Sequence, residues 1–131
     1  MKIRLHWGYA AVALGYMIGI FILSELSDQG GGGLIDSVPE LLSNALHIPL
    51  FAGLAWSLLM SLAGWRWSQT VPWELYWTIG LLAGIYAALD EWHQSFVPGR
   101  SASGADFFLD CVGITGLLII HRVWRKPRVS S

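Results

Sequence analysis

The chain has 131 residues, of which 54% are apolar and 13% charged, and its mean hydropathy is +0.52. Because a soluble domain carries about 25% charged residues, this composition argues against a soluble globular domain or a disordered chain. Eight Lys and Arg stand against nine Asp and Glu, so the basic excess of a nucleic-acid-binding protein is missing. The single cysteine excludes an internal disulfide framework and a multi-cysteine metal site. The composition indicates a small membrane protein with one domain over residues 1–131.

Four segments are long and apolar enough to be membrane-spanning helices, which need about 20 mainly apolar residues. We place these spans at residues 6–24, 46–65, 73–90 and 106–124. The first span follows basic residues as a signal peptide would, but its apolar run is too long and no small-residue cleavage site precedes Ser24. The sequence therefore predicts an all-α membrane protein with a four-transmembrane-helix bundle.

The loop after the first span contains Gly30 to Gly33 and then Ser37-Val38-Pro39-Glu40, which resembles a helical capping box. A short helix is predicted to start there and run towards His47. Pro49 is expected to kink the chain as it enters the second span.

Small residues recur at helix-packing spacing in every span, for example Gly8, Gly15 and Gly19 in the first. Small side chains let helix backbones approach closely in lipid. We expect these faces to pack inside one bundle, with a dimer or larger oligomer as the alternative.

Basic and acidic residues separate to opposite ends of the predicted bundle. If the N-terminus is cytoplasmic, that side receives seven of the eight Lys and Arg, and the outer side receives eight of the nine Asp and Glu. Six of the eight Trp also fall near the cytoplasmic interface, where an aromatic belt is expected. Because cytoplasmic loops carry an excess of Lys and Arg, we predict that the N- and C-termini are both cytoplasmic.

Most polar side chains of the spans gather near the outer membrane face. An ionisable side chain inside a span is costly, so it normally faces the bundle interior and has a partner. Asp106 and Asp110 share a helix face because they are four residues apart. Arg100 is the only outer Lys or Arg, and we expect it to pair with Glu91, Asp106 or Asp110. The candidate ligand-binding residues are His47, Asp90, Glu91, His93, Gln94, Arg100, Asp106 and Asp110.

Several candidates have an ordinary alternative. Asp90 and Glu91 would simply end a span in water, Asp106 would be a favourable charge at a helix N-terminus, and His47 would be an interfacial histidine. The sequence contains no Gly-x-Ser-x-Gly elbow, P-loop or His-Glu-x-x-His motif, so no catalytic residue can be named. The two outer histidines lack the spacing of a closed metal site, and we predict neither a metal nor a cofactor.

The string Asp90-Glu91-Trp92-His93-Gln94, followed by Gly99-Arg100 and then by Asp106, Asp110 and Gly113, resembles the motif of the VanZ-like family of small bacterial membrane proteins. The family pattern runs Asp-Glu-x-x-Gln-x-x-x-x-Gly-Arg, then Asp-x-x-x-Asn-x-x-Gly. Ser24, His47 and Leu50-Phe51 also fit the family. This chain departs from the pattern at Asp110, where the family commonly has Asn, and at Asn44, where it commonly has Lys.

The resemblance implies a multi-pass protein of the bacterial inner membrane with its matched polar residues on the outer side. The family is named for proteins that raise resistance to the glycopeptide teicoplanin. Our leading hypothesis is a non-enzymatic protein that recognises a membrane lipid or a lipid-linked cell-envelope component, without nucleic acid as a partner. The alternatives are an intramembrane enzyme acting on a lipid headgroup and a scaffold whose polar cluster only locks the bundle.

Overall fold

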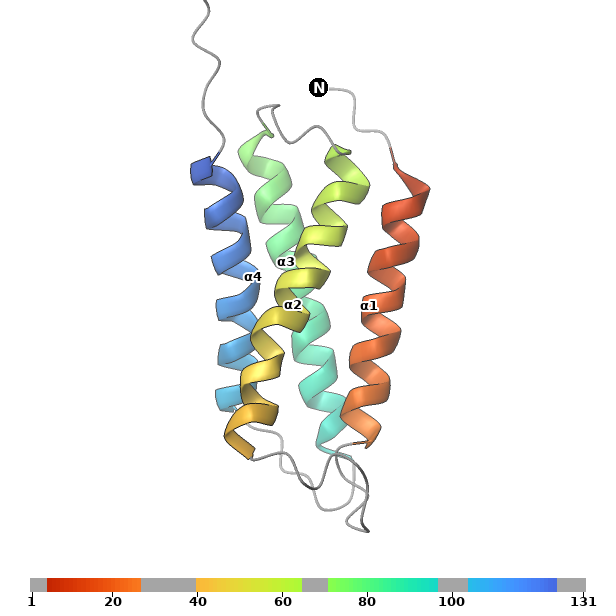
Figure 1. Ribbon diagram of the computed structural model, residues 1–131, viewed down its shortest axis with the longest axis vertical. Coiled ribbons are helices and arrows are strands. Elements are labelled where there is room, and N and C mark those ends of the chain that lie inside the picture. The colour runs from red at the N-terminus through yellow and green to blue at the C-terminus, as the bar shows by residue number, and fades with distance from the viewer. Residues whose placement is uncertain (1–4, 27–39, 65–70, 97–103, 125–131) are drawn as a thin grey trace, which may run out of the picture.

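The computed structural model describes residues 5–26, 40–64, 71–96 and 104–124, and the regular structure of these residues is helical (Figure 1). The helices in chain order are α1 (Trp7–Leu26), α2 (Glu40–Ala63), α3 (Trp73–Gln94) and α4 (Gly104–Trp124). They run alternately up and down along one long axis (Figure 1). The start of α1 and the end of α4 therefore lie at the same end of the bundle.

The two middle helices hold the bundle together. Both α2 and α3 contact each of the other helices, whereas α1 and α4 lie on opposite sides and share no contact within the described residues (Figure 1). The most deeply buried apolar side chains come mainly from α2, and Phe51, Leu54, Leu59 and Met60 are fully buried there. This arrangement makes α2 the element against which residues of α1 and α4 are positioned.

Three of the described helices contain stretches long and apolar enough to cross a membrane, namely Trp7–Glu25, Ala45–Ala63 and Gly104–Trp124. The fourth predicted span is not confirmed, because α3 falls short of this criterion. It carries three acidic residues and five Trp or Tyr side chains, which dilute its hydropathy. Its outward side is nevertheless apolar, with Leu81, Leu82, Ile85 and Leu89 all exposed, so α3 presents the surface that contact with lipid requires.

The helix boundaries correct one prediction. The helix α2 begins at Glu40 and continues through Pro49, so the separate short helix before Pro49 is wrong. Proline removes one i to i−4 hydrogen bond, and packed or membrane-embedded helices tolerate that loss. The helix α3 ends at Gln94, about one turn after the end of the predicted span. Residues 37–39 of the predicted capping box lie outside the described residues.

The small residues pack in only some of the helices. Gly53 of α2 lies against the ring of Tyr16, which would meet any added Cβ, so this glycine permits the close approach of α1 and α2. The prediction is wrong for α1, whose glycine face is turned away from the bundle. Among the described residues, nothing lies within 4 Å of where a Cβ would stand at Gly8, Gly15 or Gly19.

The two ends of the bundle differ in chemistry. We call the end where α1 and α3 finish and α2 and α4 begin the acidic end. Its polar side chains include those of Ser24, Glu25, His47, Asp90, Glu91, His93, Gln94, Asp106 and Asp110. We call the opposite end the aromatic end. It carries Trp7, Trp73, Tyr76, Trp77, His121, Arg122 and Trp124, of which the four tryptophans are 57–78% exposed.

Candidate functional site

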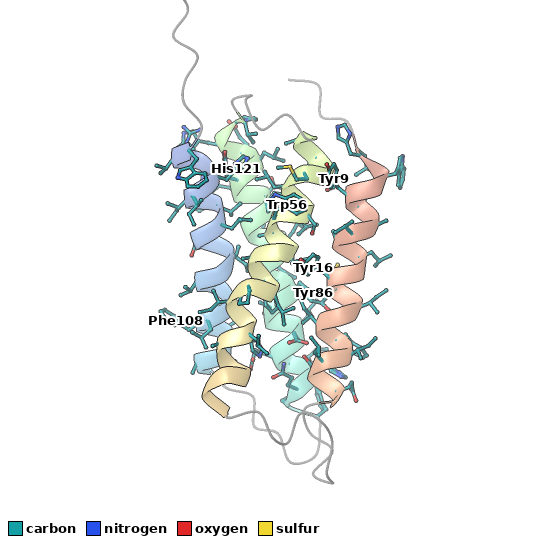
Figure 2. The ribbon with its side chains drawn as sticks, in the orientation of Figure 1. Tyr9, Tyr16, Trp56, Tyr86, Phe108 and His121 are labelled. Atoms are coloured by element: carbon teal, nitrogen blue, oxygen red, sulfur yellow. The ribbon has the colours of Figure 1, made fainter. Side chains whose placement is uncertain are left out.

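Buried polar side chains concentrate at the acidic end, and they come from all four helices. Ser24 of α1, His47 of α2, Asp90 and Gln94 of α3, and Asp106 and Asp110 of α4 are each at most 8% exposed. Oxygen and nitrogen atoms therefore lie between the helices at this end, opposite the end where His121 lies (Figure 2). Burial of so many polar groups is unfavourable unless they are hydrogen-bonded, so their partners decide what the cluster can do.

The first part of the cluster joins α2 to α4. Nδ1 of His47 lies 2.8 Å from Oδ1 of Asp110, and the Asp110 carboxylate is fully buried. The two helices approach closely beside this pair, because a Cβ on Gly113 would collide with the backbone carbonyl oxygen of Ile48. The glycine is one turn after Asp110, so the close approach holds the carboxylate within hydrogen-bonding distance of the imidazole.

The second part joins α1 to α3. The hydroxyl of Ser24 lies 2.9 and 3.0 Å from the two carboxylate oxygens of Asp90. The side-chain amide of Gln94 donates to Oδ2 of Asp90 at 2.7 Å and to the Ser24 hydroxyl oxygen at 3.1 Å. Asp90 and Gln94 are four residues apart and therefore share a helix face. The network fixes the Asp90 carboxylate with a neutral hydroxyl and a neutral amide.

Some acceptor atoms in the cluster have no donor. Among the described residues, Oε1 of Gln94, Oδ1 of Asp106 and Oδ2 of Asp110 are buried and have no hydrogen-bond partner. We call these three oxygens the open acceptors. An unsatisfied buried polar atom costs about 1–3 kcal/mol, and such atoms mark places where another group is needed. Since all three can accept, the missing groups are hydrogen-bond donors.

A third group lies at the rim of the acidic end. Nε2 of His93 is hydrogen-bonded to Oε1 of Glu25, and the two side chains are 34% and 44% exposed. The imidazole also lies against the ring of Phe21, with a centroid distance of 4.7 Å. His93 therefore contacts α1, whereas Asp110 contacts α2, and the two residues belong to different sides of the site.

Comparison with known families places these residues in context. A profile of the VanZ/LLP1 family matches residues 17–125, from within α1 to just beyond α4. The chain belongs to the VanZ/LLP1 family. The match includes the motif residues 90–113 and both halves of the polar cluster, and it confirms the resemblance drawn from the sequence. Comparisons with curated proteins and with solved structures gave no significant match.

In this VanZ/LLP1 protein, the predicted site residues divide into groups. His47, Asp90, Gln94, Asp106 and Asp110 are buried together at the acidic end, Glu91 is half-buried, and His93 lies at the rim. The reading in which Asp90 ends a span in water is wrong, because Asp90 is 4% exposed. Arg100 lies outside the described residues, so its pairing with an acidic residue stays a prediction.

Sequence reasoning left two participants out of the candidate list. Ser24 binds Asp90, and Glu25 binds His93. The position of Ser24 at the end of the first span, where it fits the family pattern, was the available signal. For Glu25, the only signal in the sequence was its position beside Ser24. In the described parts of the chain, no group of three or more His, Cys, Asp or Glu side chains could hold a metal ion, and the absence of a metal stays a prediction.

Proposed function

We propose that this protein resides in the bacterial inner membrane and binds the polar headgroup of a lipid, or of a lipid-linked envelope component, at the outer membrane face. The observation that carries the proposal is the set of open acceptors, which α3 and α4 hold at one end of the bundle. Hydroxyl, amine and sugar groups are the donors that would satisfy them.

The charge distribution supports the same class of ligand. Eight of the nine acidic residues fall on the side of the chain that contains the acidic end, and Arg100 is the only Lys or Arg there. A purely anionic ligand is therefore disfavoured. A headgroup that combines donors with a phosphate would be accommodated, since the planar guanidinium of Arg100 is suited to bind phosphate.

The position of the cluster also supports a ligand that resides in the membrane. Ionisable residues in membrane helices usually mark functional sites, and here they occupy the ends of α1 and α3 and the starts of α2 and α4. Helices that span a membrane end at about the depth of the lipid headgroups, so a lipid headgroup is the ligand that would meet this end of the bundle.

Lipid mass spectrometry on protein purified in mild detergent tests the proposal. We expect wild-type protein to retain a specific lipid, and Asp106→Asn and Arg100→Ala to lose most of it while remaining folded. Glu74→Gln is the matched control, because Glu74 is an exposed acid at the aromatic end. Identical lipid profiles from all four proteins would contradict the proposal and would favour the scaffold hypothesis.

One observation favours an enzyme as the second candidate. The contact between His47 and Asp110 is the arrangement in which a carboxylate orients an imidazole that acts as a general base. The substrate would be the headgroup that occupies the open acceptors. Incubation of the purified protein with extracted envelope lipids would then give a product that His47→Gln does not form. Unchanged lipids in both reactions would leave headgroup binding as the function.

We include a contribution to teicoplanin resistance in the proposal, because the VanZ-like family takes its name from that phenotype. The expected result is a raised inhibitory concentration of teicoplanin in cells that express the wild-type protein. Cells that express Asp106→Asn should show no increase, and those that express Glu74→Gln should match the wild type. Equal inhibitory concentrations in all strains would remove this part of the proposal.

A further inference from the structure

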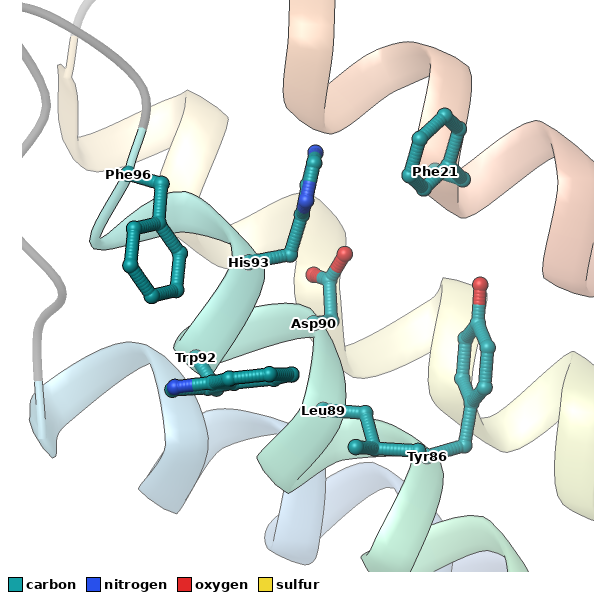
Figure 3. Close-up of a pocket in the computed structure, with 7 residues that line it drawn as sticks. All are labelled: Phe21, Tyr86, Leu89, Asp90, Trp92, His93 and Phe96. Carbon is teal, nitrogen blue, oxygen red and sulfur yellow. The ribbon is translucent and has the colours of Figure 1, made fainter.

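A cavity of about 430 Å³ lies between α1 and α3 at the acidic end (Figure 3). Its size falls within the range of about 300–1,000 Å³ that is usual for small-ligand pockets. Four of its lining side chains are aromatic, and Asp90 and His93 supply its ionisable groups. The aromatic residues are Phe21, Tyr86, Trp92 and Phe96.

The aromatic rings surround the cavity on more than one side. Trp92 and Phe96 form an edge-to-face pair with centroids 5.4 Å apart, and Phe21 of α1 stands across the cavity from α3 (Figure 3). The hydroxyl of Tyr86 donates to the backbone carbonyl of Met17, which fixes the position of its ring. Aromatic faces carry negative electrostatic potential and attract cations within about 6 Å.

Asp90 is one of the lining residues, and its side chain lies between His93 and Tyr86 in the close-up (Figure 3). It is held in place by Ser24 and Gln94 and is only 4% exposed. The described side chains at the acidic end include five acids and no Lys or Arg, the acids being Glu25, Asp90, Glu91, Asp106 and Asp110. Both the local carboxylate and the overall charge therefore favour a positively charged ligand.

The lining distinguishes between kinds of cation. A primary ammonium has three N–H donors that need acceptors, and the side chains around this cavity are mostly aromatic or aliphatic. A methylated ammonium has few or no N–H groups, and aromatic cages recognise this class of cation. Leu89, half exposed, extends the wall along α3 in the direction that a lipid chain would follow.

We propose that the cavity binds a methylated ammonium headgroup of the choline type, carried by a membrane lipid. This inference rests on the proposed function, because it names the headgroup class that the acidic end receives. The ammonium lies among the four aromatic rings and next to Asp90.

The test uses the full-length protein in neutral maltoside micelles, titrated with short-chain phospholipids and followed by native mass spectrometry. Four probes carry ethanolamine, monomethyl-ethanolamine, dimethyl-ethanolamine or choline headgroups, and a fifth probe is free choline. We expect affinity to rise with each methyl group, with the choline lipid about tenfold tighter than the ethanolamine lipid, or about 1.4 kcal/mol. Free choline should bind more weakly than the choline lipid.

Substitutions of exposed aromatic side chains test the lipid affinity without disturbing the folded structure. Trp92 and Phe96 are 64% and 66% exposed, so Trp92→Leu and Phe96→Leu should preserve the fold while lowering affinity for the choline lipid about tenfold. Trp77→Leu is the matched control, because Trp77 is 75% exposed on the same helix near the aromatic end. It should leave affinity unchanged.

Equal affinities for the choline and ethanolamine lipids would overturn this inference, as would equal losses in Trp92→Leu and Trp77→Leu. If free choline bound as tightly as the choline lipid, the proposal that the headgroup is carried by a membrane lipid would be wrong. A flat methylation series together with lipid loss in Asp106→Asn would refute the cavity assignment and leave headgroup binding standing. If Asp106→Asn also retained every lipid, both proposals would fall.

Discussion

Each end of the bundle buries a histidine that contacts another side chain at 2.8 Å. At the acidic end, His47 contacts the carboxylate of Asp110, and the other oxygen of that carboxylate is an open acceptor. At the aromatic end, Nδ1 of His121 contacts the Tyr76 hydroxyl, and the Arg122 guanidinium lies 4.1 Å from the ring centroid of Trp73.

The two ends show that a buried polar side chain is not by itself a binding site. His121 is 1% exposed and His47 is 8% exposed, so burial alone does not distinguish them. The difference lies in the partner, since a phenol is a neutral partner whereas a carboxylate brings two acceptors and a charge. The arginine at the aromatic end rests on aromatic faces, where cation–π attraction stabilises it. We therefore expect ligand-dependent effects at the acidic end and stability effects alone at the aromatic end.

The largest expected effect is the all-or-none labelling that assigns each end to a side of the membrane. Single cysteines would be introduced as Gly31→Cys, Gln69→Cys and Ser131→Cys in a Cys111→Ser background. An impermeant thiol reagent on intact cells should label only Gly31→Cys, because we predict from the charge distribution that the acidic end is outside. Labelling of Ser131→Cys without Gly31→Cys would invert the orientation.

Removal of the histidine at the acidic end should strongly destabilise the protein. His47→Leu leaves the fully buried Asp110 carboxyl group without its described partner, and leaving a buried polar group unsatisfied costs about 1–3 kcal/mol. The free energy of unfolding in mixed micelles, measured against wild type, checks this value. A change below about 1 kcal/mol would show that the pair contributes little to folding.

Asp110→Asn separates the binding role from the scaffold role. Asparagine keeps one oxygen for His47 and replaces the open acceptor with an amide donor, so we expect a change in stability below about 1 kcal/mol. Lipid retention should nevertheless fall about tenfold, or about 1.4 kcal/mol. Loss of folded protein with this variant would support the scaffold hypothesis, in which ionisation of Asp110 holds the bundle.

The smallest effect is expected at the aromatic end. Tyr76→Phe removes the hydroxyl that contacts His121, and a neutral hydrogen bond contributes about 0.5–1.5 kcal/mol. Unfolding should become easier by about that amount, while the profile of retained lipids stays that of the wild type. A changed lipid profile in this variant would mean that the two ends are coupled.

The sequence was sufficient to predict the helices because apolar runs and charge positions are local properties. The four predicted spans overlap the four helices, and the buried residues Asp106 and Asp110 were assigned to one face from their spacing. The limits were also local, since the capping pattern predicted a separate short helix before Pro49, whereas α2 is one helix from Glu40 to Ala63. Similarly, the glycine spacing in α1 defines a face but does not say towards which neighbour that face is turned.

The contacts of the site were harder to predict, because they depend on which helices are neighbours. Ser24 meets Asp90 across 66 positions of sequence, and His47 meets Asp110 across 63. Both pairs form because α1 lies beside α3 and α2 lies beside α4. The local sequence pattern of a helix does not specify which helices are its neighbours. The same reason explains why the pairing of His93 with Glu25 was missed.

The backbone contact at Gly113 gives a way to compare relatives. Any other residue there would bring its Cβ against the Ile48 carbonyl, so α2 and α4 would have to separate beside the His47–Asp110 pair. A homologous chain with a larger residue at this position should therefore lack the direct imidazole–carboxylate contact. The identity of that single residue thus sorts homologues into those that can share this headgroup chemistry and those that must have diverged from it.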